Sequence, residues 1–144
     1  MNSIAATDET WWVVCALAQE EGGADAIRVG ALREALWRSL AHLPGVSLNS
    51  PLAGGSPAIL NVSFEGVEGE SLVTALTEIA ISTGSACSSA TAAGSYVLRS
   101  LGRSTELAQS SLRFSLGRFT CAADIERASE AVKRAFMRLR SVAP

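Results

Sequence analysis

The sequence predicts an α/β domain: a small sandwich in which a short, mainly antiparallel sheet has helices packed on one side. Helix-like and strand-like hydrophobic periods alternate along the chain, and the strand-like segments are few and partly polar. The chain has 144 residues, about the length of one domain, and 48% of them are hydrophobic. It is therefore long and apolar enough to bury a core of its own.

The helices are predicted from apolar residues that recur at every third or fourth position. This period runs over residues 25–43, where a Pro-Gly pair follows, and again over residues 122–140. An apolar run predicts a shorter helix over residues 11–21, closed by a Gly-Gly pair. We therefore expect residues 1–23 to form an N-terminal segment with a short apolar helix, and residues 24–144 to form the domain itself.

The strands are predicted from the alternation of apolar and polar residues. Residues 59–64 and 111–116 alternate most clearly, and shorter strands are expected over residues 46–48 and 79–82. Two short helices are also expected, over residues 70–77 and 96–101, with a mobile loop over residues 85–95 between them.

Composition excludes several classes of function. The formal net charge of −2 provides no electrostatic attraction for nucleic acid or for an anionic membrane. The three cysteines are too few and too far apart for a disulfide framework, and no Cys/His cluster suggests a metal site. Reduced thiols are the default in the cytoplasm. We therefore expect a cytoplasmic protein with no nucleic-acid or membrane partner.

The first candidate for chemistry is Cys87, which follows a predicted strand in the run Ser85-Ala86-Cys87-Ser88-Ser89. A nucleophilic thiol needs exposure, a depressed pKa and room to move. A loop of small residues offers room, and its backbone N–H groups favour a thiolate or persulfide anion. The alternative is an inert cysteine buried just beyond a strand, because free cysteine is commonly buried. The residues alone leave both interpretations open.

The second candidate is Arg113, in the middle of the predicted strand 111–116. Alternation puts Leu112 and Phe114 on the core face and Arg113 on the opposite face. A guanidinium held there suits bidentate capture of a carboxylate. The alternative is a solvated arginine on the wet face of a sheet. Arg118, just past the strand, is expected to form a structural ion pair.

Four further residues are weaker candidates. His42 is expected to compensate the dipole near the end of a long helix, and no second histidine exists to share a metal or a proton relay. Cys15 is expected to pack among the tryptophans around it. Cys121 follows Thr120, the expected N-cap of the last helix, where a thiol pKa can be lowered but most residues are passive. Lys133, the single lysine, is interpreted as a solvated charge.

Four blocks of sequence stand out together. They are Asn61-Val62-Ser63-Phe64 followed by Val67-Glu68-Gly69-Glu70-Ser71-Leu72, then Ser82-Thr83-Gly84-Ser85-Ala86-Cys87-Ser88, then Tyr96-Val97-Leu98-Arg99-Ser100-Leu101-Gly102, and finally residues 110–120. Their order and spacing, between about residues 24 and 140, resemble those of the cysteine desulfurases. That family supplies sulfur for iron–sulfur clusters and thiolated transfer RNA.

The resemblance implies that Cys87 matches the cysteine that attacks the substrate sulfur and becomes a persulfide. It also implies that Arg113 matches the arginine that grips the substrate α-carboxylate. The fold that it implies is the small domain of fold type I pyridoxal phosphate enzymes, which packs against a large domain. Residues 90–94 lack the acidic residue and the proline that the family usually has before Ser-Tyr-Val-Leu, so the active loop is expected to be looser here.

The cofactor residues of the family have no counterpart in the sequence. Its Schiff-base lysine, the aspartate on the pyridinium nitrogen and the histidine over the ring all belong to the large domain, and Lys133 matches none of these motifs. Covalent pyridoxal chemistry needs a placed lysine and a partner for the ring nitrogen. We therefore expect this chain alone to bind no pyridoxal phosphate, which is the cofactor of the full family enzyme.

Three interpretations of function follow. The first is a cysteine desulfurase small domain that carries the persulfide-forming cysteine for iron–sulfur cluster or thiolation pathways, and that needs a large domain from another chain for catalysis. The second is a non-catalytic persulfide carrier, and the third is a binding or regulatory module toward a desulfurase or a scaffold protein. Intact cysteine and arginine motifs favour the first two, and the missing cofactor residues favour the third. The expected partners are a large-domain desulfurase chain, a sulfur acceptor or scaffold protein, or a second copy of this chain.

Overall fold

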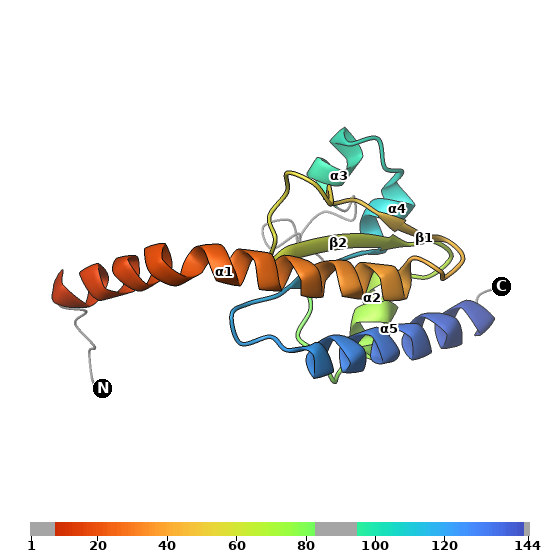
Figure 1. Ribbon diagram of the computed structural model, residues 1–144. Coiled ribbons are helices and arrows are strands. Elements are labelled where there is room, and N and C mark those ends of the chain that lie inside the picture. Colours follow the sequence, from red (N-terminus) through yellow and green to blue (C-terminus); the bar gives the residue numbers. More distant parts are fainter. Residues whose placement is uncertain (1–7, 83–94, 143–144) are drawn as a thin grey trace, which may run out of the picture.

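The computed structural model, which describes residues 8–82 and 95–142, is an α/β sandwich (Figure 1). Its sheet is antiparallel, with the order β1-β2-β3, and consists of β1 (Val46–Leu48), β2 (Ile59–Phe64) and β3 (Ser111–Ser115). Three helices cover one face of it: α1 (Asp8–Leu40), α2 (Gly69–Ala75) and α5 (Ala122–Val142). Two five-residue helices, α3 (Tyr96–Ser100) and α4 (Thr105–Gln109), lie over the other face. The predicted fold class is confirmed, with these two short helices as an addition on the second face.

The core lies between the sheet and the helices α1 and α5. Leu60, Val62 and Phe64 of β2 are fully buried on this face, and the Phe64 ring packs at 5.4 Å, centroid to centroid, on Phe136 of α5. Leu36 of α1 is also buried against this cluster. Burying one such side chain contributes about 1.5–3 kcal/mol. This face of the sheet therefore holds the domain together.

The register of β2 and β3 gives the sheet two faces of different character. Leu60 lies opposite Phe114 on the core face. On the other face Asn61 lies opposite Arg113 and Ser63 lies opposite Ser111. Because successive residues of a strand point to opposite faces, the alternation that builds the core also lines the second face with polar side chains.

The N-terminal helix differs from the prediction. Two helices are expected, over residues 11–21 and 25–43, whereas α1 is continuous through Gly22 and Gly23. Glycine in a helix costs about 1 kcal/mol relative to alanine but does not forbid the helical conformation, and the flanking Ala, Gln and Glu residues favour it. The helix ends at Leu40, earlier than the predicted end at Leu43. The division at residue 23 thus coincides with no helix end and stays a prediction.

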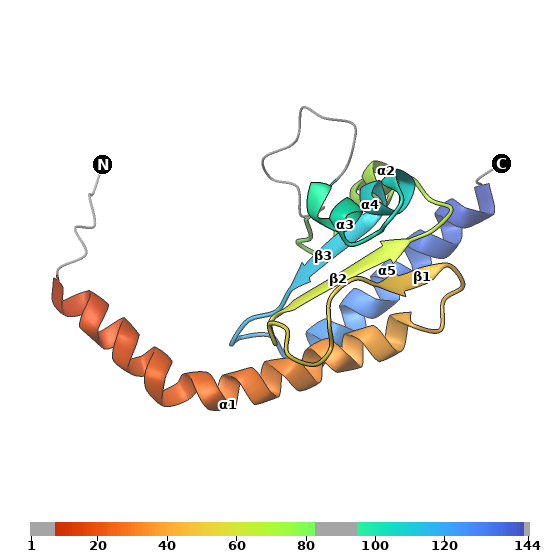
Figure 2. The ribbon, with the colours of Figure 1, turned by 90° about the horizontal axis from the view of Figure 1, so that it is seen from above.

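The first half of α1 projects beyond the sheet, as Figure 2 shows from above. Trp11 and Trp12 are 62% and 77% exposed. Val13, Val14 and Leu17 are exposed as well, so this apolar stretch makes no core contact within the described part of the chain. A helix that is apolar on all sides is normally buried. No described helix is long and apolar enough to cross a membrane.

The prediction of a strand over residues 79–82 is wrong. Only Ser82 pairs with the sheet, through a single bridge to Arg113. The Ile79 N–H still donates to Leu76 O in a turn, so the chain reaches the edge of β3 only at Ser82. The helix α4 was not predicted. Most of the predicted loop over residues 85–95 lies outside the described residues.

Candidate functional site

Arg113 lies in the middle of β3 and pairs with Ser82, the last described residue before Cys87 in the sequence. Its backbone N–H donates to Ser82 O at 2.7 Å, and its carbonyl accepts from the Ser82 N–H at 3.4 Å. Cys87 itself lies outside the described residues and stays a sequence-based candidate. It follows Ser82 by five positions in the chain. The structure therefore joins Arg113 to the start of the segment that contains Cys87.

The guanidinium of Arg113 has no partner among the described residues. The side chain is half-buried on the face opposite to the core, as predicted, and its Nε is buried without a hydrogen bond. Arg33 is a useful comparison because it is also buried. Its Nη1 and Nη2 donate to Ser56 O and Leu52 O, both at 2.6 Å, and so secure the loop before β2. Arg33 thus leaves only its Nε unpaired, whereas no nitrogen of the Arg113 guanidinium has a described partner.

The other arginines confirm that contrast. Within the described part of the chain, three more have neither an ion pair nor a side-chain hydrogen bond, and all three are exposed: Arg38, Arg99 and Arg138. Exposed arginines are satisfied by water. Arg113 differs because burial of Nε removes water from part of its guanidinium, and unpaired buried donors are costly.

A polar network covers the face of the sheet on which Arg113 lies. Asn49, just after β1, donates through Nδ2 to Asn61 Oδ1 at 2.7 Å and to Ser63 Oγ at 2.8 Å, with Ser111 Oγ at 3.3 Å. The hydroxyls of Ser63 and Ser111 are 2.8 Å apart, and Ser111 donates to Leu107 O of α4 at 2.6 Å. These bonds satisfy buried hydroxyls and join β1, β2, β3 and α4. The network holds Asn61 beside Arg113.

Arg118 forms the structural ion pair that the sequence predicts. Its Nε contacts Asp25 Oδ2 at 2.9 Å and its Nη2 contacts Glu21 Oε2 at 2.5 Å, while Arg28 donates to Thr120 O at 2.8 Å. The hydrogen bond from Arg118 is the main reason why the pKa of Asp25 lies below its usual value. The same bond raises the pKa of Arg118. This cluster fastens the middle of α1 to the loop between β3 and α5.

The two described cysteines are both exposed, which corrects the prediction for Cys15. Cys15 lies on the projecting half of α1, where the tryptophans are exposed too and bury nothing. Cys121 directly precedes α5, so it takes the N-cap position predicted for Thr120. Its N–H donates to Asp124 Oδ2 at 2.9 Å, and Sγ donates to the same oxygen at 3.1 Å. The backbone hydrogen bond is the main cause of the lowered pKa of Asp124.

His42 and Lys133 stay outside the neighbourhood of Arg113. His42 is exposed just after the end of α1. Lys133 is half-buried rather than fully solvated, and it lies on α5, which covers the core face of the sheet. The Ser111 bond to α4 shows that the face of Arg113 is the other one. Among the residues that the structure describes, no three potential metal ligands gather.

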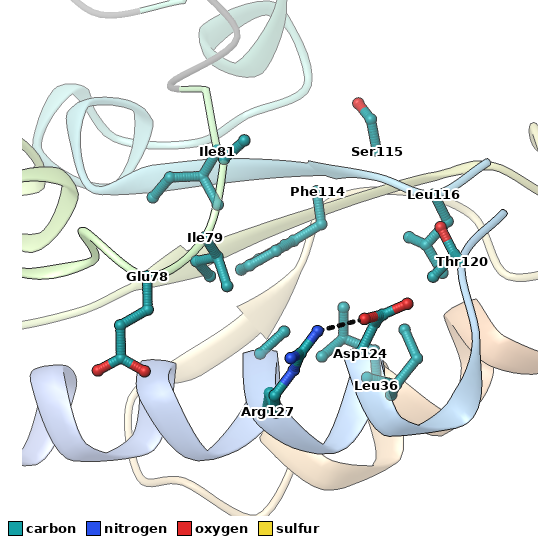
Figure 3. A pocket seen from close by; sticks show the side chains of 13 residues that line it. Leu36, Glu78, Ile79, Ile81, Phe114, Ser115, Leu116, Thr120, Asp124 and Arg127 are labelled. Carbon is teal, nitrogen blue, oxygen red and sulfur yellow. Dashed lines mark hydrogen bonds and ion pairs between the residues drawn. The ribbon is translucent and has the colours of Figure 1, made fainter.

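A groove of about 470 Å³ opens on the core side of β3, between α5 and residues 78–81 (Figure 3). Leu36, Ile79 and Phe114 point into it. Its charged residues are already engaged: Glu78 pairs with Arg134 at 3.3 Å and Asp124 pairs with Arg127 at 2.5 Å. Arg113 does not line this groove. The groove was not predicted from the sequence, and each of its described ionisable side chains already has an ion-pair partner.

The residues present do not fit pyridoxal phosphate as a cofactor of this chain alone. Lys133, the one lysine in the sequence, is separated from Arg113 by the sheet. A Schiff-base lysine and a carboxylate-binding arginine must face the same substrate. The cofactor chemistry of such a site would need groups from outside this chain.

Comparison with known proteins places the chain in context. Residues 16–128 match the family model described as aminotransferase class-V. The chain is 49% identical over 128 residues to the cysteine desulfurase IscS of Edwardsiella ictaluri and to that of Salmonella typhi. Each match covers 89% of this chain and 32% of the relative, so the chain spans about a third of the length of these relatives.

Solved structures show the same fold. A NifS-like protein from Rickettsia africae superposes with a TM-score of 0.72 at 24% identity, over 85% of this chain and 32% of that one. The cysteine desulfurase CsdA of Escherichia coli, in an S-sulfonic acid form, gives a TM-score of 0.54 at 26% identity, over 77% of this chain and 25% of that one. Both cover most of this chain with only a part of their own.

Proposed function

Since this chain belongs to the aminotransferase class-V family, we propose that it is a cysteine desulfurase small domain whose Cys87 receives and passes on persulfide sulfur. In this proposal Arg113 binds the carboxylate of the substrate, and a large domain from another chain supplies the cofactor for catalysis. The sulfur then goes to an acceptor or scaffold protein of an iron–sulfur cluster or thiolation pathway.

The pairing of Arg113 with Ser82 is the observation that carries the proposal. Arg113 is the half-buried arginine without a partner in the described chain, and it is bridged to the residue five positions before Cys87. A carboxylate held by Arg113 would therefore lie close to the start of the Cys87 segment. The 49% identity to cysteine desulfurases supports the same assignment.

The sulfur transfer that Cys87 performs without a cofactor is an exchange. The Cys87 thiolate attacks the terminal sulfur of a donor persulfide, so that one S–S bond forms at Cys87 and the S–S bond of the donor breaks. The donor leaves as a thiolate and takes up the proton that Cys87 lost. One persulfide and one thiol enter, one persulfide and one thiol leave, and no further oxidant is needed.

Catalysis from free cysteine requires a partner in this proposal, and the projecting half of α1 supports one. Exposed apolar patches of more than a few hundred Å² are uncommon on monomers and usually mark contacts. Trp11, Trp12 and Val13 are exposed apolar residues on the part of α1 that projects beyond the sheet. A large-domain chain is the occupant that completes the catalytic unit.

Sulfur loading tests the proposal directly. A cysteine desulfurase is charged with ³⁵S-cysteine, freed of substrate and incubated with this chain, and the label is followed on non-reducing gels. Wild type, Cys15→Ser and Cys121→Ser should take up label, and Cys87→Ser should not. Wild type that accepts no label would remove the carrier role and favour the binding module. Label on Cys87→Ser equal to wild type would assign the transfer to another residue.

The catalytic part of the proposal is tested by reconstitution. The chain is mixed with the isolated large domain of a cysteine desulfurase, pyridoxal phosphate and cysteine, and alanine is measured. Alanine should form only in the complete mixture, and Arg113→Ala should lower kcat/KM about a hundredfold, because a buried charge partner is lost. An Arg113→Ala variant that is folded and fully active would contradict the role of the arginine.

A further inference from the structure

The strand register puts a polar side chain of β2 directly opposite Arg113. Asn61 and Arg113 are direct cross-strand neighbours. The backbone groups of Arg113 bond outward to Ser82, so the two residues form a non-hydrogen-bonded pair. In such pairs the Cα atoms are about 4.5 Å apart and the side chains are at their closest. Asn61 is thus the nearest polar side chain that β2 offers to Arg113.

The amide of Asn61 is engaged at one of its two ends. Its Oδ1 accepts from Asn49 Nδ2 at 2.7 Å, and Asn49 is itself tied to Ser63 and Ser111. With Oδ1 engaged, the Nδ2 group is the free end of the amide, and no described residue accepts a hydrogen bond from it. Backbone bonds hold the residue in place as well, since the Asn61 N–H donates to Ser50 Oγ at 2.8 Å and its carbonyl accepts from the Asn49 N–H at 2.9 Å.

Two sets of unused donors therefore lie side by side on one face of the sheet. Arg113 has a guanidinium without an ion pair, and its Nε is shielded from water. Asn61 adds an amide N–H₂. No carboxylate of the described residues pairs with either. Donors that are partly desolvated and unpaired are unfavourable until an acceptor arrives, and an anion with two oxygens satisfies a guanidinium and a neighbouring amide at once.

We infer that Asn61 is a second binding residue for the carboxylate group of the substrate, and that Asn49 is its positioning residue. This rests on the proposed function, in which Arg113 takes that carboxylate. Arg113 supplies charge and Asn61 supplies a directed neutral donor. The pair favours a planar carboxylate over a single-atom anion such as chloride, because each carboxylate oxygen can accept from a different donor.

The inference is tested on the full chain without any cofactor. Uniformly ¹⁵N-labelled protein is titrated with sodium acetate, and sodium chloride at equal ionic strength is the control. The side-chain resonances of Arg113 Nε–H and Asn61 Nδ2–H₂, assigned by through-bond correlations in wild-type protein that also carries ¹³C, should shift together and saturate with one apparent Kd. Chloride should move neither by a comparable amount.

Variants separate binding from structure. Asn61→Ser should weaken acetate binding about three- to tenfold, the range for losing one hydrogen bond of ordinary net strength. Asn49→Ala should weaken it less, because the donor remains but is no longer oriented. Ser115→Ala, on the same face of β3 and exposed, is the matched control and should bind as wild type does. Backbone amide spectra show which variants are folded.

The outcomes are decisive even if a variant fails to fold, because the wild-type titration needs none. Saturable shifts at Arg113 with none at Asn61 would overturn the inference. So would an Asn61→Ser variant that is folded and binds acetate as tightly as wild type. The ³⁵S loading of Cys87 does not involve this pair, so a failure of the proposed carrier function is recognised separately.

Discussion

Gly69→Ala should be among the most destabilising single-methyl changes that this domain admits. Gly69 is the first residue of α2, and a Cβ placed on it would lie 2.0 Å from Gln109 O, 2.9 Å from Gln109 C and 3.1 Å from Ser110 Cα. All three atoms are backbone, so no side chain can rotate away. The Ser110 carbonyl also accepts from the Phe64 N–H at 3.0 Å, at the end of β2. Relieving the clash must therefore move either α2 or the connection from α4 to β3.

The expected cost is about 3 kcal/mol, the upper end for overpacking, because the neighbours cannot repack. For a chain of this size that corresponds to a fall in Tm of about 6–12 °C. Urea denaturation followed by circular dichroism measures the free energy of unfolding directly. Gly22→Ala is the matched control: its Cβ would meet nothing within 4 Å, and alanine is favoured over glycine in a helix. A neutral surface change alters the free energy of unfolding by up to about 0.5 kcal/mol. If the free energy of unfolding of Gly69→Ala lies that close to the wild-type value, α2 does not approach Gln109 as described.

Two further results are expected. The Asp25 carboxyl has a lowered pKa in the folded chain, mainly through its hydrogen bond with Arg118, so its contribution to stability is present above its unfolded pKa and is lost as the pH falls through the folded value. As the pH falls below about 4, the urea midpoint should therefore decrease less steeply for Asp25→Asn than for wild type. Parallel profiles of midpoint against pH would contradict a stabilising hydrogen bond between Asp25 and Arg118. The double variant Trp11→Gln and Trp12→Gln should reduce self-association in sedimentation velocity, since these side chains are 62% and 77% exposed. A wild-type chain that stays monomeric at the highest concentration would contradict self-association through these tryptophans.

The strands and the long helices were predictable because their periods are local. Leu60, Val62 and Phe64 alternate, and all three are buried as the alternation requires. The end of the first helix was less predictable, because Gly22 and Gly23 look like a stop in sequence, yet the helix continues where good helix formers flank them. The segment 79–82 reads as a strand from its apolar residues, but a strand also needs a partner, and only Ser82 reaches one. Pairing is a tertiary property that a single segment does not reveal.

The candidate site was predictable to a different extent at each residue. The face of Arg113 follows from its position between Leu112 and Phe114, and the structure confirms it. The missing partner of the Arg113 Nη groups does not follow from the sequence, since Arg33 has the same residue type and the same unpaired Nε, yet both of its Nη groups are hydrogen-bonded. The Asn49–Asn61 contact could not be predicted either, because it depends on the register of three strands. Cys87 was singled out by motif and lies outside the described residues, so its role rests on the loading experiment.

The separation of Arg113 from Lys133 decides what this chain can do by itself. Lys133 lies on α5, on the core side of the sheet, whereas Arg113 faces the side of α4. No rotation of either side chain brings an amine and a guanidinium to one substrate without crossing the core of Leu60 and Phe64. Exchange of an existing persulfide has no such requirement, because it needs a thiolate and a donor only. Sulfur acceptance should therefore not need a lysine, while breaking the carbon–sulfur bond of cysteine should depend on a lysine other than Lys133, placed on the polar face of the sheet.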